Sequence, residues 1–124
     1  MTKAPFVLIV EDDQWLAEQL ARTLMGAGIR SELATHALGA IDMIDANPPD
    51  AIVLDVLLAG PNAFTLLHEL QSHADLASIP VILCTNSADQ LAGEDIAAYG
   101  VRQVLDKATM VPDDLVVAIK KALL

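Results

Sequence analysis

Carboxylates directly follow two of the most apolar segments in the chain. Residues 6–10 (FVLIV) run into Glu11 and Asp12. Residues 51–54 (AIVL) run into Asp55. Adjacent carboxylates disfavour joint ionisation, and Mg²⁺, which prefers a few carboxylates with water and phosphate oxygens, relieves that repulsion. The three side chains therefore predict a Mg²⁺ site, provided that the fold brings the two segments together.

A hydroxyl and an ammonium group follow two later apolar segments. Thr85 comes after residues 81–84, and Lys107 comes shortly after residues 101–105. Taken singly, each is explained more simply as a strand-end hydroxyl or a solvated surface charge. Together with the carboxylates, in this order, they favour a site for a phosphoryl group, because lysine binds phosphate oxygens as a point charge and a hydroxyl donates a hydrogen bond.

Strand and helix patterns alternate along the whole chain. Strands are predicted at residues 6–10, 31–34, 51–54, 81–84 and 101–105. A helix is predicted after each strand from the helical spacing of apolar residues, including Leu16, Leu20 and Leu24 in the first and Ile96, Ala97 and Tyr99 in the fourth. This alternation predicts an α/β fold, a doubly wound parallel sheet covered on both faces. Ligands bind such sheets at the edge where the carboxyl ends of the strands meet.

Capping signals predict where several helices begin and end. Asp13 can cap the first helix, which Gly26 and Gly28 end. Gly100 ends the fourth helix, and Pro112 starts the last one.

The bulk composition describes one ordinary domain, residues 1–124. The net charge is −10 with only seven Lys and Arg, which argues against direct binding to nucleic acid. No apolar run is long enough to span a bilayer and no signal peptide is visible, so a cytoplasmic location is expected. The single cysteine, Cys84, is expected to be a small buried hydrophobe.

The ordered set of site residues resembles the receiver domain of two-component response regulators, across essentially the full chain. The acidic cluster of residues 10–13 matches the cluster after the family's first strand, and Asp55 matches its phosphoacceptor. Thr85 matches the hydroxyl after the fourth strand and Lys107 the lysine after the fifth. The resemblance implies a flavodoxin-like (βα)5 fold, with strand order 2-1-3-4-5, in a single-domain regulator like those of chemotaxis.

The resemblance also implies the chemistry. A sensor histidine kinase or a histidine phosphotransfer protein would pass a phosphoryl group to Asp55, with Mg²⁺ as the required cofactor. The metal set is expected to comprise Asp12, Asp55 and the backbone carbonyl of Leu57, with Glu11 acting through a bound water. Such a domain catalyses only its own phosphorylation and dephosphorylation, so it is not expected to be an enzyme. Its signal would pass to a separate protein partner.

The first helix is implied as part of the kinase-docking surface. Leu16 is the expected apolar anchor, whereas Leu20 is expected in the core. Trp15, the only tryptophan, is expected to report Mg²⁺ binding through its fluorescence.

The chain departs from the family pattern around the site. Ala59 and Ala63 replace a proline and a glycine in the loop after Asp55, and Asn86 replaces a small residue. Val104 replaces the family's aromatic switch residue, and Ala108 replaces a proline with a cis bond, so a trans bond is expected there. These changes put the usual switching mechanism in question, and the segment after Thr85 is the expected alternative route.

Two other functions compete with this one. The first is a receiver-like adaptor that binds partners without phosphorylation, which the altered loops favour and the intact site residues oppose. The second is a small phosphatase of the haloacid dehalogenase type. That family needs a second aspartate two residues after the nucleophile, where this chain has Leu57.

Overall fold

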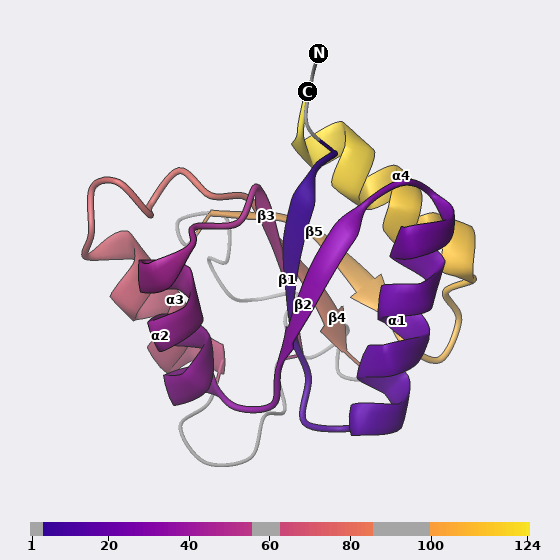
Figure 1. Ribbon diagram of the computed structural model, residues 1–124, viewed down its shortest axis with the longest axis horizontal. Coiled ribbons are helices and arrows are strands. Elements are labelled where there is room, and N and C mark those ends of the chain that lie inside the picture. The colour runs from indigo at the N-terminus through magenta and orange to yellow at the C-terminus, as the bar shows by residue number, and fades with distance from the viewer. Residues whose placement is uncertain (1–3, 56–62, 86–99) are drawn as a thin grey trace.

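A five-stranded sheet with helices on both faces forms the domain (Figure 1). The computed structural model describes residues 4–55, 63–85 and 100–124. The strands are β1 (Phe6–Val10), β2 (Arg30–Ala34), β3 (Ala51–Leu54), β4 (Val81–Thr85) and β5 (Val101–Asp106). The helices are α1 (Gln14–Gly26), α2 (Ala37–Ala46), α3 (Ala63–Gln71) and α4 (Pro112–Ala122). The helix predicted around Ile96 and Tyr99 lies outside the described residues.

The strand order is β2-β1-β3-β4-β5, and every neighbouring pair is parallel. This confirms the predicted doubly wound, flavodoxin-like sheet. The chain moves outward from β1 to β2 and then returns to place β3 on the other side of β1. The crevice between β1 and β3 is therefore the switch point at which ligands bind in such sheets.

The sheet separates two apolar layers, and each strand contributes to both. In β1, Val7 and Ile9 pack toward α1 and α4, whereas Leu8 and Val10 pack toward α2 and α3. Figure 1 shows these helix pairs on opposite faces of the sheet. All five β1 residues are buried, as expected for a central parallel strand covered on both sides. The strand ends are consequently held by packing on two faces.

The helix boundaries follow the predicted capping residues. Asp13 caps α1, because its Oδ1 accepts a hydrogen bond from the Leu16 N–H at 3.1 Å. The chain turns after α1 at Gly28, whose φ of +79° favours glycine. Pro112 occupies the first turn of α4, and the Asp114 carboxylate accepts the N–H of the residue before the helix at 2.9 Å.

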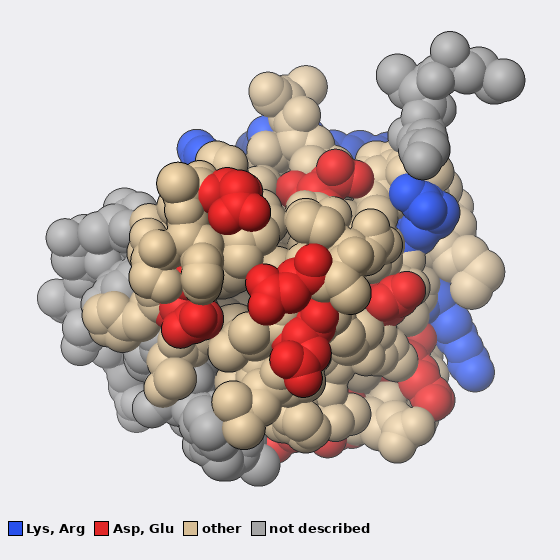
Figure 2. Space-filling model, turned by 60° about the vertical axis from the view of Figure 1, so that its left-hand side comes forward, with Lys and Arg blue, Asp and Glu red and all other residues tan. Residues whose placement is uncertain are grey.

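The surface carries far more acidic than basic side chains. On the face that Figure 2 shows, Asp and Glu are spread widely, and Lys and Arg lie at the margins. That face offers no basic patch for a phosphate backbone. Among the described helices, none is long and apolar enough to cross a bilayer.

Candidate functional site

The predicted site residues lie at the carboxyl edge of the sheet, and the strand ladders fix their backbones there. The Glu11 N–H donates to the last carbonyl of β2 at 3.0 Å. The Asp55 N–H donates to the last carbonyl of β1, also at 3.0 Å. The Lys107 N–H donates to the last carbonyl of β4 at the same distance. Each residue thus continues the hydrogen bonding between two strands by one bond. Its backbone is fixed by this bond, so the point at which its side chain begins is also fixed.

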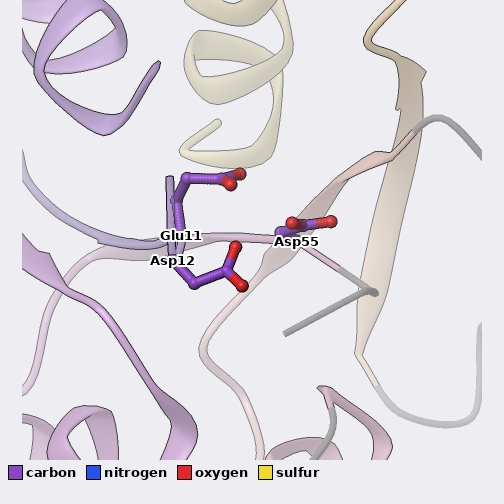
Figure 3. A group of neighbouring side chains, drawn as sticks. All are labelled: Glu11, Asp12 and Asp55. Atoms are coloured by element: carbon purple, nitrogen blue, oxygen red, sulfur yellow. The ribbon is translucent and has the colours of Figure 1, made fainter. Parts of the chain in front are cut away.

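Three carboxylates share one space at the switch point. Glu11, Asp12 and Asp55 each offer an oxygen atom, and these atoms all lie within 4.8 Å of one another. Figure 3 shows Glu11 and Asp12 leaving adjacent positions of the chain, with Asp55 beside them just after the end of β3. Glu11 and Asp55 are only 2% and 5% exposed, whereas Asp12 is open to solvent. The structure therefore brings together the acidic residues that the sequence predicted to converge.

Lys107 joins the two buried carboxylates. Its Nζ lies 2.7 Å from Glu11 Oε2 and 3.1 Å from Asp55 Oδ2. The second Glu11 oxygen, Oε1, accepts the Asp13 N–H at 3.2 Å. The Lys107 side chain is itself mostly buried, with 14% exposed. The pairing of Lys107 with Glu11 was not predicted from the sequence, which suggested only that both belong to one site.

Burial and pairing shift the ionisation of this pair in a defined way. Burial raises the pKa of Glu11 above its ordinary value, and the nearby Asp55 adds to the rise, although the hydrogen bond from Lys107 opposes it. Burial alone would lower the pKa of Lys107. Its contacts with Glu11 and Asp55 outweigh that effect, so its pKa is raised. The ammonium therefore stays charged and holds the carboxylate pair together.

The donor set suits Mg²⁺. Carboxylate oxygens are the ligands that this cation prefers, and it retains several of its waters. Asp12 is exposed, so its oxygens lie where a hydrated cation can enter. Leu57, whose carbonyl was predicted as a further ligand, lies outside the described residues.

Thr85 ends β4 and is fully buried, and its carbonyl accepts the Lys107 N–H at 3.0 Å. Val104 is half-buried and packs against the core layer on the side of α2 and α3. The peptide bond before Ala108 is trans, as predicted. Ala59 and Asn86 lie outside the described residues.

An apolar groove of about 450 Å³ adjoins Lys107 between α1 and the start of α4. Its lining includes Trp15, Leu16, Met110 and Val111. Trp15 and Val111 are 69% and 55% exposed, which is unusual for such large apolar side chains. The part of this groove that precedes α4 was not predicted from the sequence, although Met110 and Val111, two apolar residues directly before Pro112, were a usable signal.

The expected roles of two core residues are confirmed. Leu20 is 7% exposed and packs in the core, whereas its neighbour on the helix, Leu16, is only half-buried. Cys84 is buried, and its Sγ lies 3.9 Å from the Met110 Sδ. Burial raises the pKa of the Cys84 thiol to about 12, so the thiol is neutral and unreactive at ordinary pH.

Comparisons with known proteins agree with this geometry. The response regulator receiver domain family matches residues 7–120. The response regulator MprA of Mycobacterium sp. (strain KMS) is 36% identical over 93 residues, which cover 74% of this chain and 40% of that protein. The chain thus matches about two fifths of the length of its curated relatives.

Solved structures show the same fold. A putative response regulator from Chloroflexus aurantiacus J-10-fl has a TM-score of 0.82 and 33% identity, with 98% of each chain covered. A sensor protein from Polaromonas sp. JS666 has a TM-score of 0.90 and 21% identity, covering 96% of this chain and 95% of that one. The family match spans nearly the whole chain, and the site residues converge at the switch point of the sheet. The chain therefore belongs to the response regulator receiver domain family of two-component systems.

Proposed function

We propose that this chain is a phosphoacceptor domain, in which Asp55 receives a phosphoryl group from a phosphohistidine of a sensor kinase or phosphotransfer protein in a Mg²⁺-dependent reaction. The observation that carries this proposal is the contact of Lys107 with Glu11 and Asp55, beside the exposed carboxylate of Asp12. A buried carboxylate, a paired ammonium and an open metal ligand are the parts that phosphoryl transfer to a carboxylate needs.

Each residue has a distinct task in the transfer. An Asp55 carboxylate oxygen attacks phosphorus; the new P–O bond forms as the P–N bond to the donor imidazole breaks, and the imidazole leaves with that electron pair. Asp12, Asp55 and the Leu57 carbonyl would hold Mg²⁺, with Glu11 acting through a bound water. When bound, the cation neutralises charge on the transferring oxygens.

Lys107 and Thr85 complete the set of groups that would contact the phosphoryl oxygens. The Lys107 ammonium lies 3.1 Å from Asp55 before the reaction, so only a small movement is needed to reach a phosphoryl oxygen on that carboxylate. The Thr85 hydroxyl donates to a second oxygen. Both groups favour the product because the phosphoryl oxygens carry more negative charge at this site than the free carboxylate.

A similar structure supports the choice of metal. The receiver domain of a sensor histidine kinase from Pseudomonas aeruginosa PAO1 has magnesium coordinated in its active-site cleft. Its TM-score with this chain is 0.86 at 21% identity, and 97% of this chain is covered. That likeness concerns the fold, and the acidic cluster of this chain offers carboxylate oxygens of the kind that Mg²⁺ prefers.

The groove beside Lys107 is the proposed docking surface for the phosphodonor protein. An incoming phosphohistidine must approach Asp55, and the groove opens next to that site. Leu16 is the proposed apolar anchor, since it is half-buried and lines the groove. Exposed Trp15 enlarges the same apolar surface.

In this proposal the chain is one domain, residues 1–124, that works in the cytoplasm as a signalling module. It catalyses its own phosphorylation and dephosphorylation, without turnover of a separate substrate. Its phosphorylated state would be recognised by a downstream protein.

A small phosphodonor tests the proposal without a partner protein. Incubation with acetyl phosphate and Mg²⁺ should add one phosphoryl group per chain, as measured by intact mass spectrometry. Asp55→Asn should add none, because the amide is not nucleophilic, and Asp13→Asn is the matched control that should still be labelled. Unchanged mass in the native chain, with Mg²⁺ binding demonstrated, would favour the adaptor function instead.

A further inference from the structure

A histidine, rather than one of the usual capping residues, caps the helix α2. His36 occupies the N-cap position, and its Nδ1 accepts a hydrogen bond from the Gly39 N–H at 3.0 Å. Ser, Thr, Asp and Asn usually serve as N-caps, because their side-chain oxygens accept the free N–H groups of the first turn. An imidazole nitrogen can do the same only while the ring is neutral and its proton is on Nε2.

Gly39 makes room for this ring. A Cβ atom at position 39 would lie 2.9 Å from His36 Cε1 and 3.3 Å from Nδ1. Both distances are shorter than ordinary carbon contacts, so the ring would have to move away from any larger residue. The glycine and the histidine therefore form one capping unit, at a position inside a helix where glycine is otherwise unfavourable.

Protonation would oppose this cap in two ways. A protonated Nδ1 is a donor and can no longer accept the Gly39 N–H. The added positive charge would also lie at the helix N-terminus, where the helix dipole disfavours cations. The first turn of α2 has no acidic residue that could offset the charge.

Within the described parts of the chain, His36 forms no ion pair with the charged groups around α2. The titratable and charged residues on α2 and on the elements packed against it are Arg30, Glu32, Asp42, Asp45, His68 and Glu69. The neighbouring strand β1 carries none. His36 is exposed, so protons reach it freely.

We propose that His36 and Gly39 form a pH-sensitive cap, and that protonation of His36 loosens the first turn of α2. The cap lies at the same sheet edge as the acidic site. The last residue of β2, Ala34, precedes it by two residues and accepts the Glu11 N–H at 3.0 Å. This property is independent of phosphorylation, and its test needs neither metal nor partner.

Hydrogen exchange of the Gly39 amide, measured by NMR between pH 5 and pH 8, tests the cap directly. The protection factor, which removes the intrinsic pH dependence of exchange, should fall about fivefold as His36 becomes protonated, the equivalent of a typical N-cap. The Gly39 amide shift and the His36 ring nitrogen shifts should change over the same pH range.

Two variants separate the cap from other effects of pH. His36→Asn keeps an accepting oxygen that does not titrate, so its Gly39 protection should not depend on pH. Gly39→Ala should have weak protection of residue 39 at every pH, although alanine favours the helix. The proposal is wrong if protection in the native chain is as independent of pH as in His36→Asn, or if Gly39→Ala retains the native pH dependence.

Discussion

Glu11 and Asp12 are neighbours in the chain and share one site, yet they belong to regions with opposite properties. Glu11 is 2% exposed and is paired with Lys107, together with buried Asp55. Asp12 is open to solvent. The site thus has a buried half, formed by Glu11, Asp55 and Lys107, and an open half formed by Asp12.

The difference separates two tasks. Burying charged groups is unfavourable unless they are paired, and the Lys107 ammonium supplies that pairing. The buried half therefore holds the proposed nucleophile in a fixed position. The open half keeps an oxygen ligand in water, where a hydrated cation can bind without displacing the core. The two halves should therefore respond differently to substitution.

The largest expected effect concerns Cys84, which lies beneath the buried half and whose pKa is raised to about 12 from 9.0. Its thiolate population near pH 8 should be about a thousandfold lower than in the unfolded chain, because each pKa unit is a factor of ten. Alkylation by iodoacetamide should be slower in the native protein by about that factor, compared with the protein in urea. Comparable rates in the two states would mean that water reaches this half freely.

Removal of Lys107 should destabilise the metal-free protein. Lys107→Met leaves two carboxylates buried side by side, and loss of one partner from a buried ion pair costs about 3 kcal/mol or more. Urea denaturation measures this cost. Lys120→Met, at an exposed position of α4, is the matched control and should change the unfolding free energy by less than about 0.5 kcal/mol. Equal effects of the two substitutions would show that the Lys107 contacts contribute nothing.

The raised pKa of Lys107 also gives this contribution a pH dependence. The folded protein holds the Lys107 proton more tightly than the unfolded chain does. The contribution of Lys107 to the stability of the folded protein is therefore complete below its pKa in the unfolded chain, about 10.4. It is lost as the pH rises through the higher pKa of the folded protein. As the pH rises above the unfolded value, the native protein should therefore lose more stability than Lys107→Met does.

Asp12→Asn should leave the stability of the protein nearly unchanged but weaken the binding of Mg²⁺. Its effect on the unfolding free energy should be below about 0.5 kcal/mol, because the residue is exposed. Its Mg²⁺ affinity should fall about tenfold or more, since a charged ligand is lost. The fluorescence of Trp15, on the neighbouring groove, reports the titration, and isothermal calorimetry checks it. An unchanged Mg²⁺ affinity in Asp12→Asn would show that Asp12 is not a ligand of the metal.

The smallest expected effect is on docking. Leu16→Ala should slow phosphoryl transfer from the cognate kinase severalfold, by about the contact energy of a half-buried leucine. Phosphorylation by acetyl phosphate should stay normal, because Leu16 is not among the residues proposed to take part in the reaction. Gln14→Ala, at the exposed start of α1 and outside the groove lining, is the control. A native kinase rate in Leu16→Ala would exclude Leu16 as an anchor.

Much of this arrangement could be predicted from the order of residues. Apolar runs identified β1, β3 and β4 to within one residue, since a central parallel strand is buried on both faces. The Asp13 cap and the Pro112 helix start followed from local hydrogen bonding and from the fixed φ of proline. The convergence of Glu11, Asp12 and Asp55 followed from the geometry of parallel sheets.

The features that the sequence did not predict depend on distant contacts or unusual chemistry. The Lys107–Glu11 pair joins residues 96 positions apart, so it requires knowledge of the strand register and of which side chains are buried. The His36 cap was missed because the propensities for N-caps favour oxygen acceptors. The groove residues before α4 have no periodic pattern, because they belong to a connecting segment.

The central claim is that Asp55 is the residue that becomes phosphorylated, and reductive trapping of the phosphorylated protein tests it most directly. Borohydride reduces an aspartyl phosphate to homoserine, which peptide mass spectrometry locates in the chain. After treatment with acetyl phosphate and Mg²⁺, homoserine should appear at position 55, and omission of Mg²⁺ should remove it. Homoserine at position 12 or 13, with unmodified Asp55, would contradict this account of the site.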